Sequence, residues 1–172
     1  PDNDFKVPRA FSQFRVFVAR NILSKLANRQ YLLVNFLEAP LLALIIGYFT
    51  KFISEESSGA SYVFRENVNL PVYLFMSVVV ALFMGLMVSA EEIIRDKKIL
   101  ERESFLRLSW LSYIHSKIFV LFCISAVQTL SFVLVGNLVL EVKGMFLSYW
   151  LILFTTSCLA NMIGLNLSSG LN

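Results

Sequence analysis

Charged residues are scarce in this chain of 172 residues: Asp, Glu, Lys and Arg together make up 16% of it, against about 25% in ordinary globular domains. Cysteine, with two residues, and glycine, with seven, are also few, which excludes a disulfide-stapled domain and a collagen-like repeat. Apolar residues take their place, at 57% of the chain. That share is too large for a disordered segment or a small soluble domain. The composition therefore predicts an integral membrane protein.

Residues that perform catalysis or bind metal ions are equally few. His115 is the only histidine, and no Asp lies close to it in the sequence. Cys123 and Cys158 both fall inside apolar runs, which argues against a disulfide or a metal site. We therefore expect no catalytic residue and no metal ligand. Because the chain begins at Pro1 and ends at Asn172 without a closing element, we also expect it to be part of a longer protein.

Four apolar stretches are each long enough to cross a bilayer, for which a helix needs about 20 residues. Helices are expected because backbone polar groups in lipid must be satisfied within the segment. The predicted spans cover about residues 31–53, 70–90, 116–140 and 145–167. Together they define a transmembrane domain over residues 31–172.

A different kind of helix is predicted in the N-terminal segment, residues 1–30. Apolar residues recur at helical spacing from Phe11 onward, whereas Arg15, Arg20, Lys25 and Arg29 lie mostly on the other side. This pattern is typical of a helix in the membrane interface, and packing against a soluble domain is the alternative. The predicted fold class is an all-α integral membrane protein with an N-terminal interfacial amphipathic helix and four transmembrane helices.

The distribution of basic residues predicts the orientation of the spans. All but three of the 15 Lys and Arg residues precede the first span or fall between positions 91 and 117. The positive-inside rule therefore places the N-terminus and the loop of residues 91–115 in the cytoplasm. This loop mixes charges of both signs with apolar residues, so it can dock on a cytoplasmic partner. A solvated loop with a turn against the membrane is the alternative.

Two stretches resemble a known family. The first, before span one, contains Gln13 and the pair Arg20-Asn21. The second follows span two and reads Glu91-Glu92, Arg95, Lys98, Arg102-Glu103, Tyr113 and Lys117. With these motifs the chain resembles the membrane-spanning part of an ABC transporter permease of the ABC-2 type, similar to the half-transporters of the G subfamily.

The resemblance implies an ATP-driven exporter, in which four of six spans are present here. ATP and Mg would be bound by a nucleotide-binding domain, fused or separate, because nothing in this chain matches G-x-x-x-x-G-K-[ST]. No cofactor is expected on the chain itself, which would not be an enzyme alone. The implied partners are that domain, a second permease copy and the lipid bilayer, but no nucleic acid. One departure is Leu108-Ser109-Trp110, where the family has Gly-Leu-Tyr.

The resemblance also implies residue roles. Arg102 and Glu103, with Arg20 as a weaker candidate, would couple the spans to the nucleotide-binding domains. The alternative function is a non-transporting membrane scaffold or a subunit of a larger membrane complex, and an intramembrane enzyme ranks third.

Polar residues inside the spans are further candidates. Glu38 lies roughly 11 Å from the start of span one, where an ionisable group is costly. The favoured interpretation is a structural pairing with a Lys or Arg of a neighbouring helix, or a position closer to the interface. The alternative is a group that faces the substrate path and senses protons or cations. Gln128 and Asn161 are expected to face other helices, where they find hydrogen-bond partners, and either can touch a substrate.

Small residues recur at every fourth position in two spans. Such ladders allow helices to approach closely, so they predict helix packing within the bundle or between two copies, in preference to a substrate path. The ladders are Ala81, Gly85 and Ser89 in the second span and Thr156, Ala160, Gly164 and Ser168 in the fourth.

Overall fold

The computed structural model describes residues 10–58, 69–90, 92–93, 110–142 and 144–170. These residues form five helices and no strand, as the fold class predicts. The helices are α1 (Ala10–Ala27), α2 (Arg29–Ser58), α3 (Leu70–Ala90), α5 (Trp110–Leu140) and α6 (Phe146–Gly170).

Four of the helices are long and apolar enough to cross a membrane, which confirms the four predicted spans. Their apolar segments are Arg29–Lys51, Leu70–Ala90, Leu111–Leu140 and Phe146–Gly170. Helix α5 begins at Trp110, before the expected start at residue 116, because its first turns carry buried side chains such as Tyr113 that pack inside the bundle. The protein is an integral, multi-pass membrane protein.

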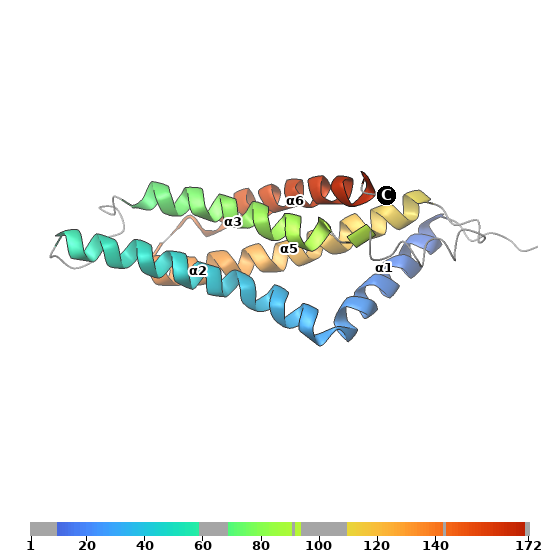
Figure 1. Ribbon diagram of the computed structural model, residues 1–172, viewed down its shortest axis with the longest axis horizontal. Coiled ribbons are helices and arrows are strands. Elements are labelled where there is room, and N and C mark those ends of the chain that lie inside the picture. Colours follow the sequence, from blue (N-terminus) through green and yellow to red (C-terminus); the bar gives the residue numbers. More distant parts are fainter. Residues whose placement is uncertain (1–9, 59–68, 91, 94–109, 143, 171–172) are drawn as a thin grey trace, which may run out of the picture.

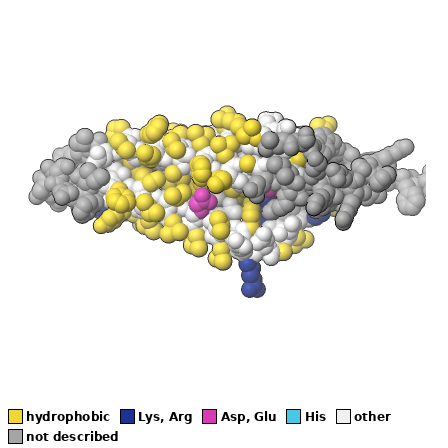
Figure 2. All heavy atoms as spheres, in the orientation of Figure 1, with side chains coloured by type: hydrophobic (Ala, Val, Ile, Leu, Met, Phe, Trp, Pro, Cys, Tyr) yellow, Lys and Arg dark blue, Asp and Glu magenta, His cyan; other side chains and the backbone are white. Residues whose placement is uncertain are grey.

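The spans lie side by side and successive ones run in opposite directions (Figure 1). Helix α5 is the centre of the arrangement, since it packs against each of the other four helices. Helix α3 packs chiefly against α6, and α2 chiefly against α5. Exposed apolar side chains form a hydrophobic band over the outside of the bundle (Figure 2).

Helix α1 departs from the bundle axis at an elbow (Figure 1). The elbow is Asn28, the one residue between α1 and α2. Its side-chain Oδ1 accepts a hydrogen bond from the backbone N–H of Tyr31 at 3.1 Å, and its backbone oxygen accepts one from Leu32 at 3.1 Å. Asn28 therefore caps the N-terminus of α2, a position for which asparagine is strongly preferred.

The face of α1 that packs on the bundle is more polar than the amphipathic pattern indicates. Its buried side chains are Gln13, Phe17, Asn21 and Lys25. Apolar side chains of the same helix, Phe11 among them, remain exposed. The pattern placed Lys25 on the polar outer side, but it belongs to the buried face. The reason is that an acidic side chain inside the protein pairs with it.

Candidate functional site

Three charged side chains meet in a buried cluster where α1, the residues that follow α3, and α5 come together. Lys25 Nζ lies 2.8 Å from Glu92 Oε2, and Lys117 Nζ lies 2.8 Å from Glu92 Oε1. The side chains of Lys25, Glu92 and Lys117 are only 6%, 2% and 3% exposed, respectively. We call these residues the charge cluster. Both oxygens of one carboxylate are thus engaged by ammonium groups from two different helices.

Aromatic and polar neighbours hold the charge cluster in place. Lys25 Nζ also donates to the Tyr31 hydroxyl at 3.1 Å, and Lys117 Nζ lies 5.7 Å from the centre of the Tyr113 ring. One turn earlier in α1, Asn21 Nδ2 donates to Ser116 Oγ of α5 at 3.2 Å. Helix α1 is therefore attached to α5 by polar contacts as well as by packing.

The lysines set the ionisation of Glu92. Burial alone would raise the pKa of its carboxyl group, but the ammonium groups of Lys117 and Lys25 hold that pKa below its ordinary value of 4.5. The carboxylate is consequently charged at neutral pH. The next residue, Ile93, donates its backbone N–H to Ser168 Oγ of α6 at 3.0 Å, so the segment after α3 is anchored to a third helix.

The pairing of these three charges could not be predicted from the sequence. Lys25 and Glu92 are 67 positions apart and Glu92 and Lys117 are 25 apart, so their meeting depends on how the helices pack. The available signal was their position: each lies beside a membrane boundary on the side predicted to be cytoplasmic. Charges at one depth on different helices are candidates for pairing.

Of the three coupling residues that the resemblance implies, the structure describes Arg20. Arg102 and Glu103 lie outside the described residues. Arg20 is on α1, half-buried, and its guanidinium carbon lies 5.2 Å from the centre of the Phe17 ring. Phe17 in turn makes an edge-to-face contact with Tyr113 of α5, at 5.9 Å between ring centres. Arg20 therefore covers the contact between α1 and α5.

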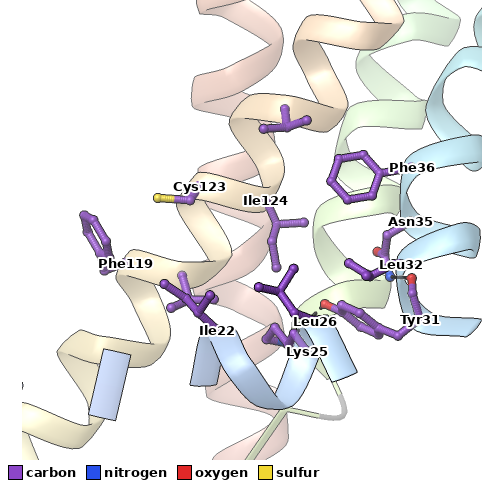
Figure 3. A pocket seen from close by; sticks show the side chains of 12 residues that line it. Ile22, Lys25, Leu26, Tyr31, Leu32, Asn35, Phe36, Phe119, Cys123 and Ile124 are labelled. Carbon is purple, nitrogen blue, oxygen red and sulfur yellow. Dashed lines mark hydrogen bonds between the residues drawn. The ribbon is translucent and has the colours of Figure 1, made fainter. Parts of the chain in front are cut away.

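A cavity of about 260 Å³ lies inside the elbow, between α1, the start of α2 and α5 (Figure 3). Its wall is almost entirely apolar, with Ile22 and Leu26 from α1, Phe36 from α2 and Ile124 from α5. Lys25 also lines it, but its ammonium group is engaged by Glu92. The cavity has the size and the apolar wall to hold an apolar group.

A second cavity of about 310 Å³ lies between α2 and α3 and is more polar. Glu38, Tyr31, Asn35 and Glu92 line it together with apolar side chains. The structure thus places Glu38 at a cavity, half-buried, and no Lys or Arg of the described residues forms an ion pair with it.

The two predicted intramembrane amides are buried and hydrogen-bonded. Gln128 Nε2 of α5 donates to the backbone oxygen and to the Oδ1 of Asn35 in α2, both at 3.2 Å. Asn161 Nδ2 of α6 donates to Ser125 Oγ of α5 at 2.7 Å, and Ser157 Oγ donates to the same oxygen at 3.0 Å. These amides join α5 to α2 and to α6.

The two predicted ladders of small residues face each other between α3 and α6, and all of their residues except Thr156 are buried: Ala81, Gly85, Ser89, Ala160, Gly164 and Ser168. The approach is so close that a Cβ atom on Gly85 would lie 2.6 Å from the backbone oxygen of Ser157. A Cβ on Gly164 would collide with Ser89 Oγ. The ladders therefore form the α3–α6 interface within one chain.

Comparison of the chain with known proteins finds a match to a family model. The family model described as ABC-2 type transporter matches residues 12–172. No curated protein and no solved structure matches the chain.

Proposed function

Because this chain belongs to the ABC-2 type transporter family, as a transmembrane permease component of an ABC transporter, we propose that it serves an ATP-driven exporter in which α1 and the charge cluster transmit movement to the spans. The membrane domain of this family is the permease part of the transporter and is not itself catalytic. It acts together with a nucleotide-binding domain. ATP and Mg are assigned to that domain, and a second permease copy completes the substrate path.

The observation that carries the proposal is the buried pairing of Glu92 with Lys25 and Lys117. Separating buried charges from each other is costly, because each would be left without its partner in a region of low polarity. A displacement of α1 therefore moves the end of α3 and the start of α5 with it. Arg102 and Glu103, in the segment between those two helices, are proposed as direct contacts with the nucleotide-binding domain.

The other end of the bundle offers a contrasting ion pair. Lys51 Nζ of α2 lies 2.8 Å from Glu141 Oε1, just after α5, with side chains that are 27% and 60% exposed. Exposed pairs contribute little, because water already solvates both charges. Losing this pair should leave transmission unaffected, so Glu141→Gln is a matched control for Glu92→Gln.

The experiment uses the intact protein that contains this chain, reconstituted in lipid vesicles with Cys123 and Cys158 replaced by alanine. A reporter cysteine at the exposed position Met145, outside the apolar segments, is alkylated with and without ATP. We expect ATP to change the alkylation rate in the parent protein and in Glu141→Gln. In Glu92→Gln, and in Arg102→Gln combined with Glu103→Gln, ATP hydrolysis should persist while the ATP-dependent change is lost.

Two results would contradict the proposal. An ATP-dependent change of normal size in folded Glu92→Gln protein would show that the charge cluster transmits nothing. A parent protein that hydrolyses no ATP would instead favour the alternative, a non-transporting membrane scaffold. Thermal unfolding of every variant verifies that it is folded.

A further inference from the structure

We propose that the cavity between α2 and α3 binds the ammonium group of an amphiphilic organic cation, with Glu38 as its counter-ion. The inference deepens the proposed function and rests on it, because it names the chemical class of molecule that the permease holds. The ligand chemistry is an ammonium group on an apolar tail, as in a free alkylamine or a phosphatidylethanolamine head group.

The depth of Glu38 is the first argument. It lies nine positions after Arg29, or about 14 Å along the helix axis, within the apolar segment Arg29–Lys51. A carboxylate at such a depth is costly and is retained where it meets a partner or lines a functional cavity. Figure 2 shows an acidic side chain within the hydrophobic band of the bundle.

The charges around the cavity are the second argument. Glu92 also lines the cavity, but Lys25 and Lys117 each engage one of its oxygens at 2.8 Å, so it has no carboxylate oxygen left for a further cation. Glu38 has no hydrogen bond or ion pair to any other described residue. An incoming ammonium group would therefore find its carboxylate partner in Glu38.

The remaining wall explains why the cation should carry a tail. Val34 of α2 and Met87 and Val88 of α3 line the same cavity, and the first two are more than half exposed on the outside of the bundle. An alkyl chain can thus reach the cavity sideways from the bilayer. Methionine adapts to chains of different shape because its side chain is unbranched and flexible.

A metal ion fits this cavity less well than an ammonium group. Calcium takes six to eight oxygen ligands and magnesium requires six. The described residues contain no group of three or more His, Cys, Asp or Glu side chains that could hold a metal ion. One carboxylate facing an apolar wall matches a single organic charge instead.

The test measures binding to the intact protein in maltoside micelles without nucleotide. The probe is radiolabelled dodecylammonium, and the competitor is dodecanol, which has the same tail. We expect wild-type protein to bind dodecylammonium about tenfold more tightly than dodecanol, the ratio for 1.4 kcal/mol. Glu38→Gln should bind both with equal affinity, whereas the control Glu141→Gln should bind like the wild type.

Val34→Phe distinguishes the effect of the Glu38 charge on binding from the effect of the cavity volume. It keeps Glu38 but fills part of the space, so it should weaken binding of both dodecylammonium and dodecanol. Phosphatidylethanolamine and phosphatidylglycerol are then added as competitors. Displacement by phosphatidylethanolamine alone identifies a lipid head group as the occupant, and displacement by neither lipid identifies a free amphiphile. Both results support the proposal.

The proposal is overturned if wild-type protein does not distinguish the cation from the alcohol, or if folded Glu38→Gln protein still does. Glu38→Gln removes a charge from the membrane interior, so we expect it to fold, and thermal unfolding verifies this. Because no nucleotide is present, failure here leaves the coupling role of the charge cluster standing. Failure of the Glu92→Gln experiment likewise leaves the binding result intact.

Discussion

At the scale of single residues, the charge cluster is the feature whose burial costs the most free energy. One carboxylate, on Glu92, faces two ammonium groups in a region from which water is nearly excluded. Such a group is weak evidence for stability in itself, since removing three charges from water is costly. Substituting the three charged residues one at a time, however, measures how much stability each one loses without its partner.

We expect Glu92→Gln to be more damaging than Lys25→Met. The first change leaves the buried ammonium groups of Lys25 and Lys117 without their carboxylate and should cost about 3–5 kcal/mol of the free energy of unfolding. The second leaves the Glu92–Lys117 pair in place and should cost less than half as much. The measurement is thermal unfolding of each purified variant in detergent. Equal losses would mean that Lys117 alone does not satisfy Glu92.

The pH dependence provides a cross-check on the same residue. Because the folded-state pKa of Glu92 lies below its ordinary value of 4.5, its contribution to stability is present above pH 4.5 and is lost as the pH falls toward the folded-state pKa. Glu92→Gln should therefore show a smaller drop in the unfolding temperature between pH 5 and pH 3 than the parent protein does. An identical drop in both proteins would contradict this assignment.

At the scale of elements, the α3–α6 interface depends on having almost no side chain between the two backbones. Gly85 lies against Ser157 and Ala160 of α6, and Gly164 lies against Ser89 of α3. Helices in lipid associate mainly through van der Waals packing and hydrogen bonds, since lipid and apolar side chains are alike. A methyl group placed here therefore removes the source of attraction.

Gly164→Ala should lower the free energy of unfolding by about 1–3 kcal/mol, because the new methyl group collides with Ser89. Adding Ser89→Gly should restore part of the loss, since it removes the atoms that collide. Gly170→Ala is the matched control in the same helix, because no atom lies within 4 Å of its new Cβ. Additive losses in the double variant, measured by thermal unfolding, would argue against a direct contact between these positions.

At the scale of the whole molecule, sequence predicts the spans better than their pairing. Uniformly apolar segments are recognisable by length alone, so four spans could be predicted from hydrophobicity. The buried face of α1 could not, because its partners, such as Ser116, lie far along the chain. The same holds for the candidate site. Glu38 could be recognised from the sequence as a charge within a span, but its cavity could not, because side chains from α3 form part of the wall.

Orientation in the membrane is a property of the whole chain. With both native cysteines replaced, we expect Met145→Cys, at the start of α6, to react with a membrane-impermeant maleimide applied to intact cells. Ser24→Cys, on α1, should react only after the cells are made permeable, because the basic residues on its side favour the cytoplasm. Both side chains replaced are exposed in the structure. The opposite pattern would reverse the topology.

The interleaved pairing of the helices governs the order in which the protein is assembled during synthesis. Helix α2 packs chiefly against α5, and α3 chiefly against α6, so each early span meets its main partner only after two further spans have been made. Until then Asn35 of α2 lacks its contact with Gln128, and Ser89 of α3 lacks the backbone of α6. During synthesis the first two spans therefore remain in the bilayer with their inner faces uncovered until α5 and α6 have been made.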